Sequence, residues 1–107
     1  MTEFAGTLKE RVLIERPTDL RTASGLQEAG WEPVARCLAA IVAEGAGAEA
    51  EAQALSAMPR YLVTIRRRDG IAVGQRVLWG ARAMLVKQRI DDPKLPDRIL
   101  LRCEEMR

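Results

Sequence analysis

The sequence predicts an all-β fold, a small antiparallel barrel or sandwich of about six strands with one short inserted α-helix. Hydrophobic and polar residues alternate with a period of two in several short segments, most clearly around Val63 and Ile65. Glycines at the breaks, such as Gly70 and Gly80, suit the turns between strands. Only the segment at about 46–57 has the composition of a helix.

The N-terminal part of the chain predicts two strands joined by a loop. In the first strand, over 9–17, Val12 and Ile14 share one face, and Pro17 is expected to end the pairing because it lacks a backbone donor. Segment 18–30 is polar and has no periodicity, which predicts an exposed, mobile loop. Segment 31–43 fits a strand or a helix by pattern alone, and Pro33 and the β-branched residues near its end favour a strand.

The predicted helix at about 46–57 is rich in Ala and Glu and contains no β-branched residue. Its apolar face consists of Ala48, Ala52 and Leu55, and Pro59 closes it. A short helix with such a small apolar face buries little surface by itself. We therefore expect it to pack on the barrel or on a neighbouring subunit.

The rest of the chain predicts consecutive strands from residue 60 to residue 90 and a final strand over 98–104. Segment 91–97 is polar and bounded by prolines, which predicts an exposed loop. The shared period-2 phase of the strands predicts one common core. Its expected members are Val12, Ile14, Trp31, Val63, Ile65, Val77, Trp79, Val86, Ile99 and Leu101.

The length of 107 residues fits one domain, 1–107, with a modest core. Seventeen basic and 15 acidic residues give a formal net charge of +2, too small by itself to indicate a nucleic-acid-binding protein. The basic residues are nevertheless concentrated in the central strands, and some could contact phosphates or a neighbouring subunit. These candidates for a DNA channel or an interface are Arg66, Arg67, Arg68, Arg82 and Arg89. For the run 66–68, the structural alternative is a solvated strand end.

Composition argues against an enzyme. The chain has no histidine, so it can form neither a Ser-His nor a Cys-His dyad nor a histidine-containing zinc site. The remaining carboxylate pairs, Asp91-Asp92 and Glu104-Glu105, are consecutive, so their side chains would point apart in a strand. We expect no catalytic residues, no cofactor and no metal.

The two cysteines, Cys37 and Cys103, are far apart in sequence and have apolar neighbours. This pattern favours two reduced, buried thiols over a disulfide or a reactive nucleophile. The N-terminus has an acidic residue where a signal peptide would be basic, and no apolar run reaches the length of a membrane span. We therefore expect a protein assembled in the cytoplasm, with no membrane partner.

The order of these signals resembles the phage head-tail joining (head-tail adaptor) family, whose members are small connector or neck proteins of tailed phages and phage-derived gene transfer agents. The likeness covers nearly the whole chain, and its evidence is the order of the pieces. The pieces are Gly6-x-Leu8-x-x-Arg11-Val12-x-Ile14-x-Arg16-Pro17, Gly30-Trp31, Ala39-Ala40-Ile41, Tyr61-Leu62-Val63-Thr64-Ile65-Arg66, Gly70-Ile71, Gln75-Arg76-Val77, Ala83-Met84-Leu85-Val86 and Leu101-x-Cys103-Glu104. The predicted helix is richer in alanine than the family pattern.

This resemblance implies a structural role without catalysis. It implies a homo-oligomeric ring, a hexamer, in the neck of a virion or gene transfer agent particle, closing the DNA-filled capsid and offering a docking surface to the tail. The implied partners are the portal-adaptor layer, the tail-terminator or other tail proteins, and packaged double-stranded DNA bound non-specifically. The resemblance applies equally to a phage and to a gene transfer agent. It also applies equally to the stopper layer and to other layers of the neck.

The alternative is a free-standing nucleic-acid-binding barrel of the OB or SH3-like kind, with Arg66, Arg67, Arg68 and Arg82 on the phosphates. One Tyr, one Phe and two Trp leave few aromatic platforms on which single-stranded bases could stack.

Overall fold

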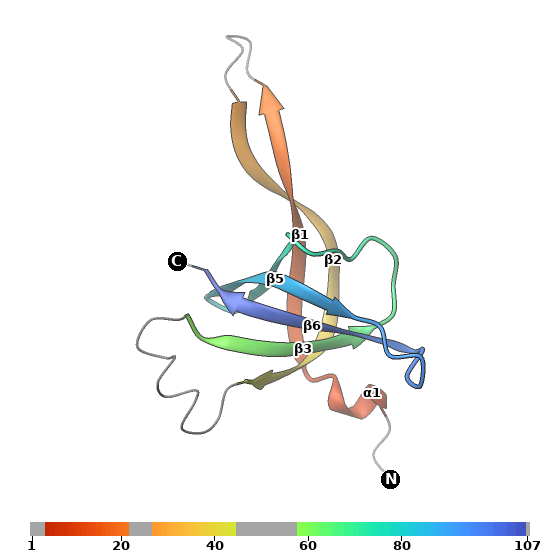
Figure 1. The fold of residues 1–107 in the computed structure, drawn as a ribbon. Helices are drawn as coiled ribbons and strands as arrows, with labels where there is room; N and C mark the ends of the chain where they lie inside the picture. Colours follow the sequence, from red (N-terminus) through yellow and green to blue (C-terminus); the bar gives the residue numbers. More distant parts are fainter. Residues whose placement is uncertain (1–3, 22–26, 45–57, 107) are drawn as a thin grey trace.

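The computed structural model describes residues 4–21, 27–44 and 58–106. All strand pairs are antiparallel, and the strands close into a barrel in the order β1-β2-β3-β6-β5-β4 (Figure 1). The elements are α1 (Phe4–Thr7), β1 (Glu10–Arg21), β2 (Gln27–Ala43), β3 (Arg60–Arg66), β4 (Arg76–Trp79), β5 (Arg82–Ile90) and β6 (Arg98–Glu105). The predicted all-β class is confirmed, and the barrel is the form that it takes.

The helix predicted at about 46–57 lies outside the described residues. The short α1 was not predicted, and Leu8, directly after it, is buried. The predicted loop at 91–97 is present between β5 and β6, where the Asp92 carboxylate accepts a hydrogen bond from the Lys94 backbone N–H at 2.9 Å. Gly70 and Gly80 have φ angles of 88° and 58°, which explains why glycine occupies these two turns.

The prediction for the first two strands was wrong in its boundaries. Pro17 does not end β1, because the strand pairs with β2 without interruption from Glu15 to Arg21, and most of the predicted loop 18–30 is strand. Pro17 lies opposite Trp31, and Pro33 lies opposite Glu15. These two pairs are two residues apart along the strands, so they occupy equivalent positions in the alternating hydrogen-bond pattern of the hairpin. Proline is tolerated at such a position when its nitrogen points away from the partner strand, because no hydrogen bond between the strands is then lost.

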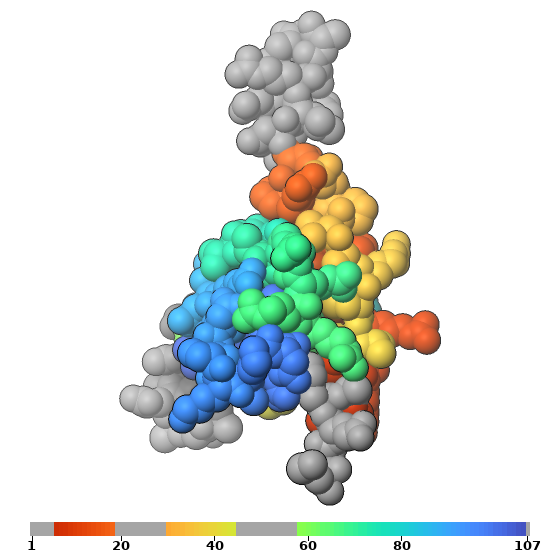
Figure 2. All heavy atoms as spheres, turned by 90° about the vertical axis from the view of Figure 1, so that its right-hand side faces the viewer, coloured from red at the N-terminus to blue at the C-terminus, as the bar shows by residue number. Residues whose placement is uncertain are grey.

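The β1–β2 hairpin therefore continues well beyond the barrel as an arm. β4 pairs with β1 only at Leu13–Glu15, and β3 pairs with β2 only at Ala39–Ala43. Within the described residues, 16–21 of β1 and 27–32 of β2 therefore pair only with each other, and these two segments form the arm. Figures 1 and 2 show the arm rising from the barrel, and the molecule is elongated, with extents of 57 × 35 × 26 Å. Prolines on both outer edges near the base of the arm disfavour the addition of another strand there.

A β-bulge marks the place where the arm leaves the barrel. Ile14 pairs with Ala35 but Glu15 pairs with Pro33, which leaves Val34 as an extra residue on β2. Bulges bend a strand and increase its local twist. This bulge bends the hairpin at the point where it leaves the barrel wall and continues as the arm.

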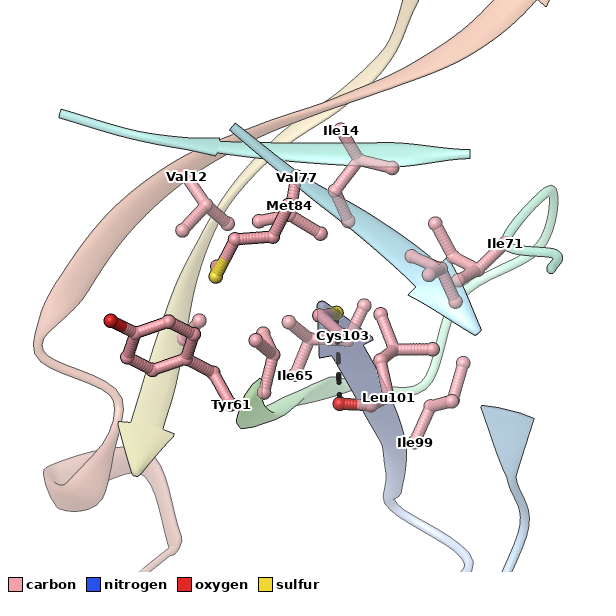
Figure 3. Close-up of a cluster of buried hydrophobic side chains, with 13 residues drawn as sticks. Val12, Ile14, Tyr61, Ile65, Ile71, Val77, Met84, Ile99, Leu101 and Cys103 are labelled. Atoms are coloured by element: carbon pink, nitrogen blue, oxygen red, sulfur yellow. Dashed lines mark hydrogen bonds between the residues drawn. The ribbon is translucent and has the colours of Figure 1, made fainter. Parts of the chain in front are cut away.

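One hydrophobic core fills the barrel (Figure 3). The predicted core is confirmed for Val12, Ile14, Val63, Ile65, Val77, Val86, Ile99 and Leu101, all buried. Trp79 packs against this core while partly exposed. Trp31 was wrongly assigned to it, because its position in β2 lies beyond the bulge, at the base of the arm. The predicted core did not include the buried residues Ala39, Tyr61, Ile71 and Met84, and Cys103, which was expected to be buried, is also part of it.

Candidate functional site

The five candidate arginines do not form one group. Arg66 ends β3 and pairs in register with Arg98 at the start of β6, and Arg67 and Arg68 follow it. Arg89 lies near the end of β5, directly before loop 91–97, which leads to the start of β6 and therefore to the same end of the barrel. Arg82 lies at the start of β5, level with the C-terminal end of β6 and therefore at the opposite end of the barrel. We call the first location the charged end and the second the aromatic end.

At the charged end, Arg67 and Arg89 share one carboxylate, that of Asp91. Arg67 Nη2 lies 2.8 Å from Asp91 Oδ1, and Arg89 Nε lies 2.9 Å from Asp91 Oδ2. Hydrogen bonding by Arg89, and then by Arg67, holds the pKa of the Asp91 carboxyl below its usual value. Arg67 also donates to the Pro96 carbonyl at 2.8 Å, and Arg89 donates to the carbonyl of Ile71. These contacts tie the ends of β3 and β5 to loop 91–97.

The other arginines of this end are also engaged. Arg98 pairs with Asp97 at 2.9 Å and lowers the pKa of that carboxyl, and the charge of Arg66 adds to this effect. Arg68 is exposed and interacts with the thiol of Cys37. The charged end is thus a network of neighbouring opposite charges at the rim of the barrel, in which Arg67 and Arg89 are already neutralised in part.

At the aromatic end, Arg82 lies against two aromatic rings instead of a carboxylate. Its guanidinium carbon is 5.8 Å from the centre of the Tyr61 ring and 5.6 Å from that of Trp79, and its Nη1 donates to the Tyr61 hydroxyl. The two rings meet edge to face with centroids 5.9 Å apart. Trp79 Nε1 donates to Glu10 Oε2 at 3.0 Å, which joins β4 to the start of β1. Tyr61 is itself buried, so its ring offers no open stacking platform.

A third cluster, at the base of the arm, was not foreseen. The Arg76 guanidinium lies 4.4 Å from the centre of the Trp31 ring and donates from Nε to Glu15 Oε1 at 2.7 Å. The Glu15 side chain is 12 % exposed and that of Arg76 is 24 % exposed, so this ion pair is better shielded than those of the charged end. Residues from β1, β2 and β4 meet here, beside the bulge. The sequence carried only a weak signal for this cluster, since it depends on the pairing of β1 with β4.

Both cysteines are free thiols, as predicted, but only Cys103 is buried as expected, whereas Cys37 is partly exposed. Cys103 is buried, and burial raises its pKa to about 12. Burial also raises the pKa of the half-buried Cys37, although Arg68 partly offsets this effect. Within residues 4–21, 27–44 and 58–106, no three His, Cys, Asp or Glu side chains are grouped so that they could hold a metal ion. In the same ranges no helix has the length and apolarity needed to cross a membrane.

The closed barrel, its projecting arm and its ionic and aromatic clusters define a small all-β domain with several candidate contact surfaces. The family described as "Phage head completion protein" matches residues 5–106. The chain belongs to this family, which confirms the resemblance seen in the sequence and gives the protein a structural role in phage head completion.

Two solved structures share the fold. Protein SF1141 from Shigella flexneri 2a has a TM-score of 0.70 at 20 % identity, with 96 % of each chain covered. A chain in the virion of a native gene transfer agent particle has a TM-score of 0.64 at 14 % identity, with 92 % of this chain and 96 % of that chain covered. At these identities the likeness shows the fold alone. Among curated proteins, no match was found.

Proposed function

We propose that the protein is a neck component of a tailed phage or a gene transfer agent, which forms a ring on the preceding neck layer, closes the DNA-filled head and provides a docking surface for the tail. The observation that carries the proposal is the family match over nearly the whole chain, 5–106. The similar fold of a chain in a gene transfer agent virion supports it. The arm is a further support, because a long hairpin can reach an adjacent layer while the barrel packs beside its neighbours.

The experiment is to delete the gene for this chain in the phage or gene transfer agent that encodes it. We expect heads that fill with DNA but lose it, and few tailed particles. Supplying the wild-type chain from a plasmid should restore both properties. Tailed particles that retain DNA at wild-type levels without the chain would overturn the proposal.

The proposed contact with packaged DNA concerns the candidate arginines. Contacts with phosphates would be weak, independent of sequence and strongly dependent on salt, because they rest on counterion release. The run 66–68 is exposed, whereas Arg89 is only partly exposed and also donates a hydrogen bond to the Ile71 carbonyl, so the run is the better candidate for this contact.

Replacing Arg66, Arg67 and Arg68 together by Ser separates the possible roles. A DNA-channel role predicts that necks form but packaged DNA leaks, whereas an interface role predicts that neck assembly fails. Normal assembly with full DNA retention would identify the run as a solvated strand end. Purified variant and wild-type chains should also be compared for binding to duplex DNA at low salt, because strong binding by the isolated chain would favour the alternative of a nucleic-acid-binding barrel.

A further inference from the structure

An open groove on the outside of the barrel combines apolar side chains with arginines. It runs over β1, β2 and β4, and its outward-facing lining residues are Arg11, Leu13, Arg36, Leu38 and Leu78. The strand register makes these residues neighbours: Arg11 lies opposite Leu38, and Leu13 lies opposite both Arg36 and Leu78. Leu38 is 47 % exposed, and it lines the groove together with the partly exposed Leu13 and Leu78, so the groove presents an apolar patch and not a single exposed leucine.

The two arginines of the groove differ from those described above. Among the described residues, neither Arg11 nor Arg36 forms an ion pair or a side-chain hydrogen bond, and both are exposed. Apolar residues at the centre of a patch, with arginine beside them, are typical of protein interfaces. A DNA backbone would leave Leu38 in water. The groove therefore fits a protein partner that presents an apolar side chain next to a carboxylate.

A surface of this chemistry lies on the other side of the same barrel. In the strand order β1-β2-β3-β6-β5-β4, the pair β5–β6 is three places away from the pair β1–β2, which is the farthest separation in a closed ring of strands. On these strands Leu85 and Glu104 lie opposite each other. Both occupy positions that alternate with the buried residues of their strands, so both face outward. The Glu104 carboxylate forms no ion pair within the described residues, although Arg60 lies across from it on β3.

We infer that the groove receives the β5–β6 face of a second copy of this chain, with Leu85 against Leu38 and Glu104 beside Arg11 and Arg36. Two different patches on opposite sides of one barrel form a head-to-tail contact, and such a contact closes into a ring when its rotation closes. The inference rests on the proposed function for the ring itself and adds the surfaces that form it.

The first test exchanges charges in particles. Arg36→Glu alone and Glu104→Arg alone should each reduce the amount of chain in purified particles about tenfold or more, because each places like charges together in the contact. The double variant should recover most of the loss. Lys94→Glu, a charge reversal in the exposed loop 91–97, is the matched control and should incorporate normally. Circular dichroism of each purified chain verifies that the variants are folded.

The second test joins the two patches covalently. With Cys37 replaced by Ser, and with the buried Cys103 left in place, the pair Leu38→Cys and Leu85→Cys should give a ladder of disulfide-linked oligomers on oxidation of assembled particles. Chains carrying only one of the two new cysteines should give no ladder beyond dimers. Normal incorporation of both single charge variants, or loss without recovery in the double variant, would overturn the inference.

A lysine-reactive crosslinker on wild-type particles separates this failure from failure of the proposed function. Higher oligomers with that reagent, but no ladder from the cysteine pair, would mean that the ring exists and uses other surfaces. No oligomers with either reagent would contradict the ring itself.

Discussion

The two ends of the barrel use arginine in different ways. At the charged end, Arg67 and Arg89 hold one exposed carboxylate, that of Asp91, whereas at the aromatic end Arg82 lies against the rings of Tyr61 and Trp79. Exposed ion pairs contribute little to stability and weaken with salt, but an arginine over partly buried rings also covers apolar surface. The difference teaches that arginines grouped by sequence can belong to separate structural units, which respond differently to mutation, salt and pH.

Both ends depend on the core between them, so the largest expected effect is a core truncation. Ile65→Ala should lower the free energy of unfolding by about 2 to 5 kcal/mol, because it leaves a cavity in a fully buried site. Thr64→Ala, on the outward face of the same strand, is the control and should change little. Urea unfolding followed by circular dichroism measures both. An Ile65→Ala chain as stable as the wild type would show that β3 does not face the core.

The base of the arm should be the next most sensitive region. Arg76→Ala removes the hydrogen bonds to Glu15 and the contact with Trp31, and leaves a largely buried carboxylate without its partner. We expect a loss of about 2 to 3 kcal/mol in the free energy of unfolding. Arg76→Ala combined with Glu15→Gln should be less destabilised than Arg76→Ala alone. Equal stability of these two variants would mean that Glu15 carries no such penalty.

At the aromatic end, Trp79→Phe keeps an aromatic ring but loses the hydrogen bond to Glu10. The expected cost is about 1 kcal/mol in the free energy of unfolding. Glu10→Gln keeps an acceptor oxygen and should cost less. If Glu10→Gln proved as damaging as Trp79→Phe, then charge, and not this hydrogen bond, would matter at the site.

The charged end should show the smallest effect, visible mainly as a change with pH. The pKa of Asp91 is lower in the folded protein than in the unfolded chain, so its ion pairs stabilise the fold above about pH 4 and this contribution is lost as the pH falls through the folded-state pKa. Asp91→Asn should therefore be slightly less stable than the wild type at pH 7, and the difference should shrink toward pH 2. Thermal unfolding over this pH range, with Asp92→Asn as the matched control, measures it. A difference that grows on acidification would contradict the assignment.

Local patterns predicted the barrel strands well because each depends only on nearby residues. Val63 and Ile65 alternate with Leu62 and Thr64, and this alternation is the same in the sequence and in the burial of β3. Gly70 was recognised as a turn residue for the same reason, since its positive φ is a local requirement.

Features that depend on strand order and register could not be predicted in this way. The arm was missed because Pro17 normally ends a strand, and only its pairing phase with Trp31 explains why it does not. Arg82 was grouped with Arg66, although β6 lies between their strands, β5 and β3. Arg66 is level with the start of β6 and Arg82 with its C-terminal end, so the two arginines lie at opposite ends of the barrel. The candidate residues were identified as charged surface residues, but their partners were decided by long-range pairing.

Cryo-electron microscopy of isolated necks tests the central claim most directly, namely that this chain is a ring-forming component between head and tail. The account predicts a closed ring of identical six-stranded barrels at the head–tail junction, with the β1–β2 arm of each copy extending toward an adjacent layer. Necks with wild-type DNA retention and tail attachment in which no such barrel is present, or in which it occurs as a single copy, would contradict it.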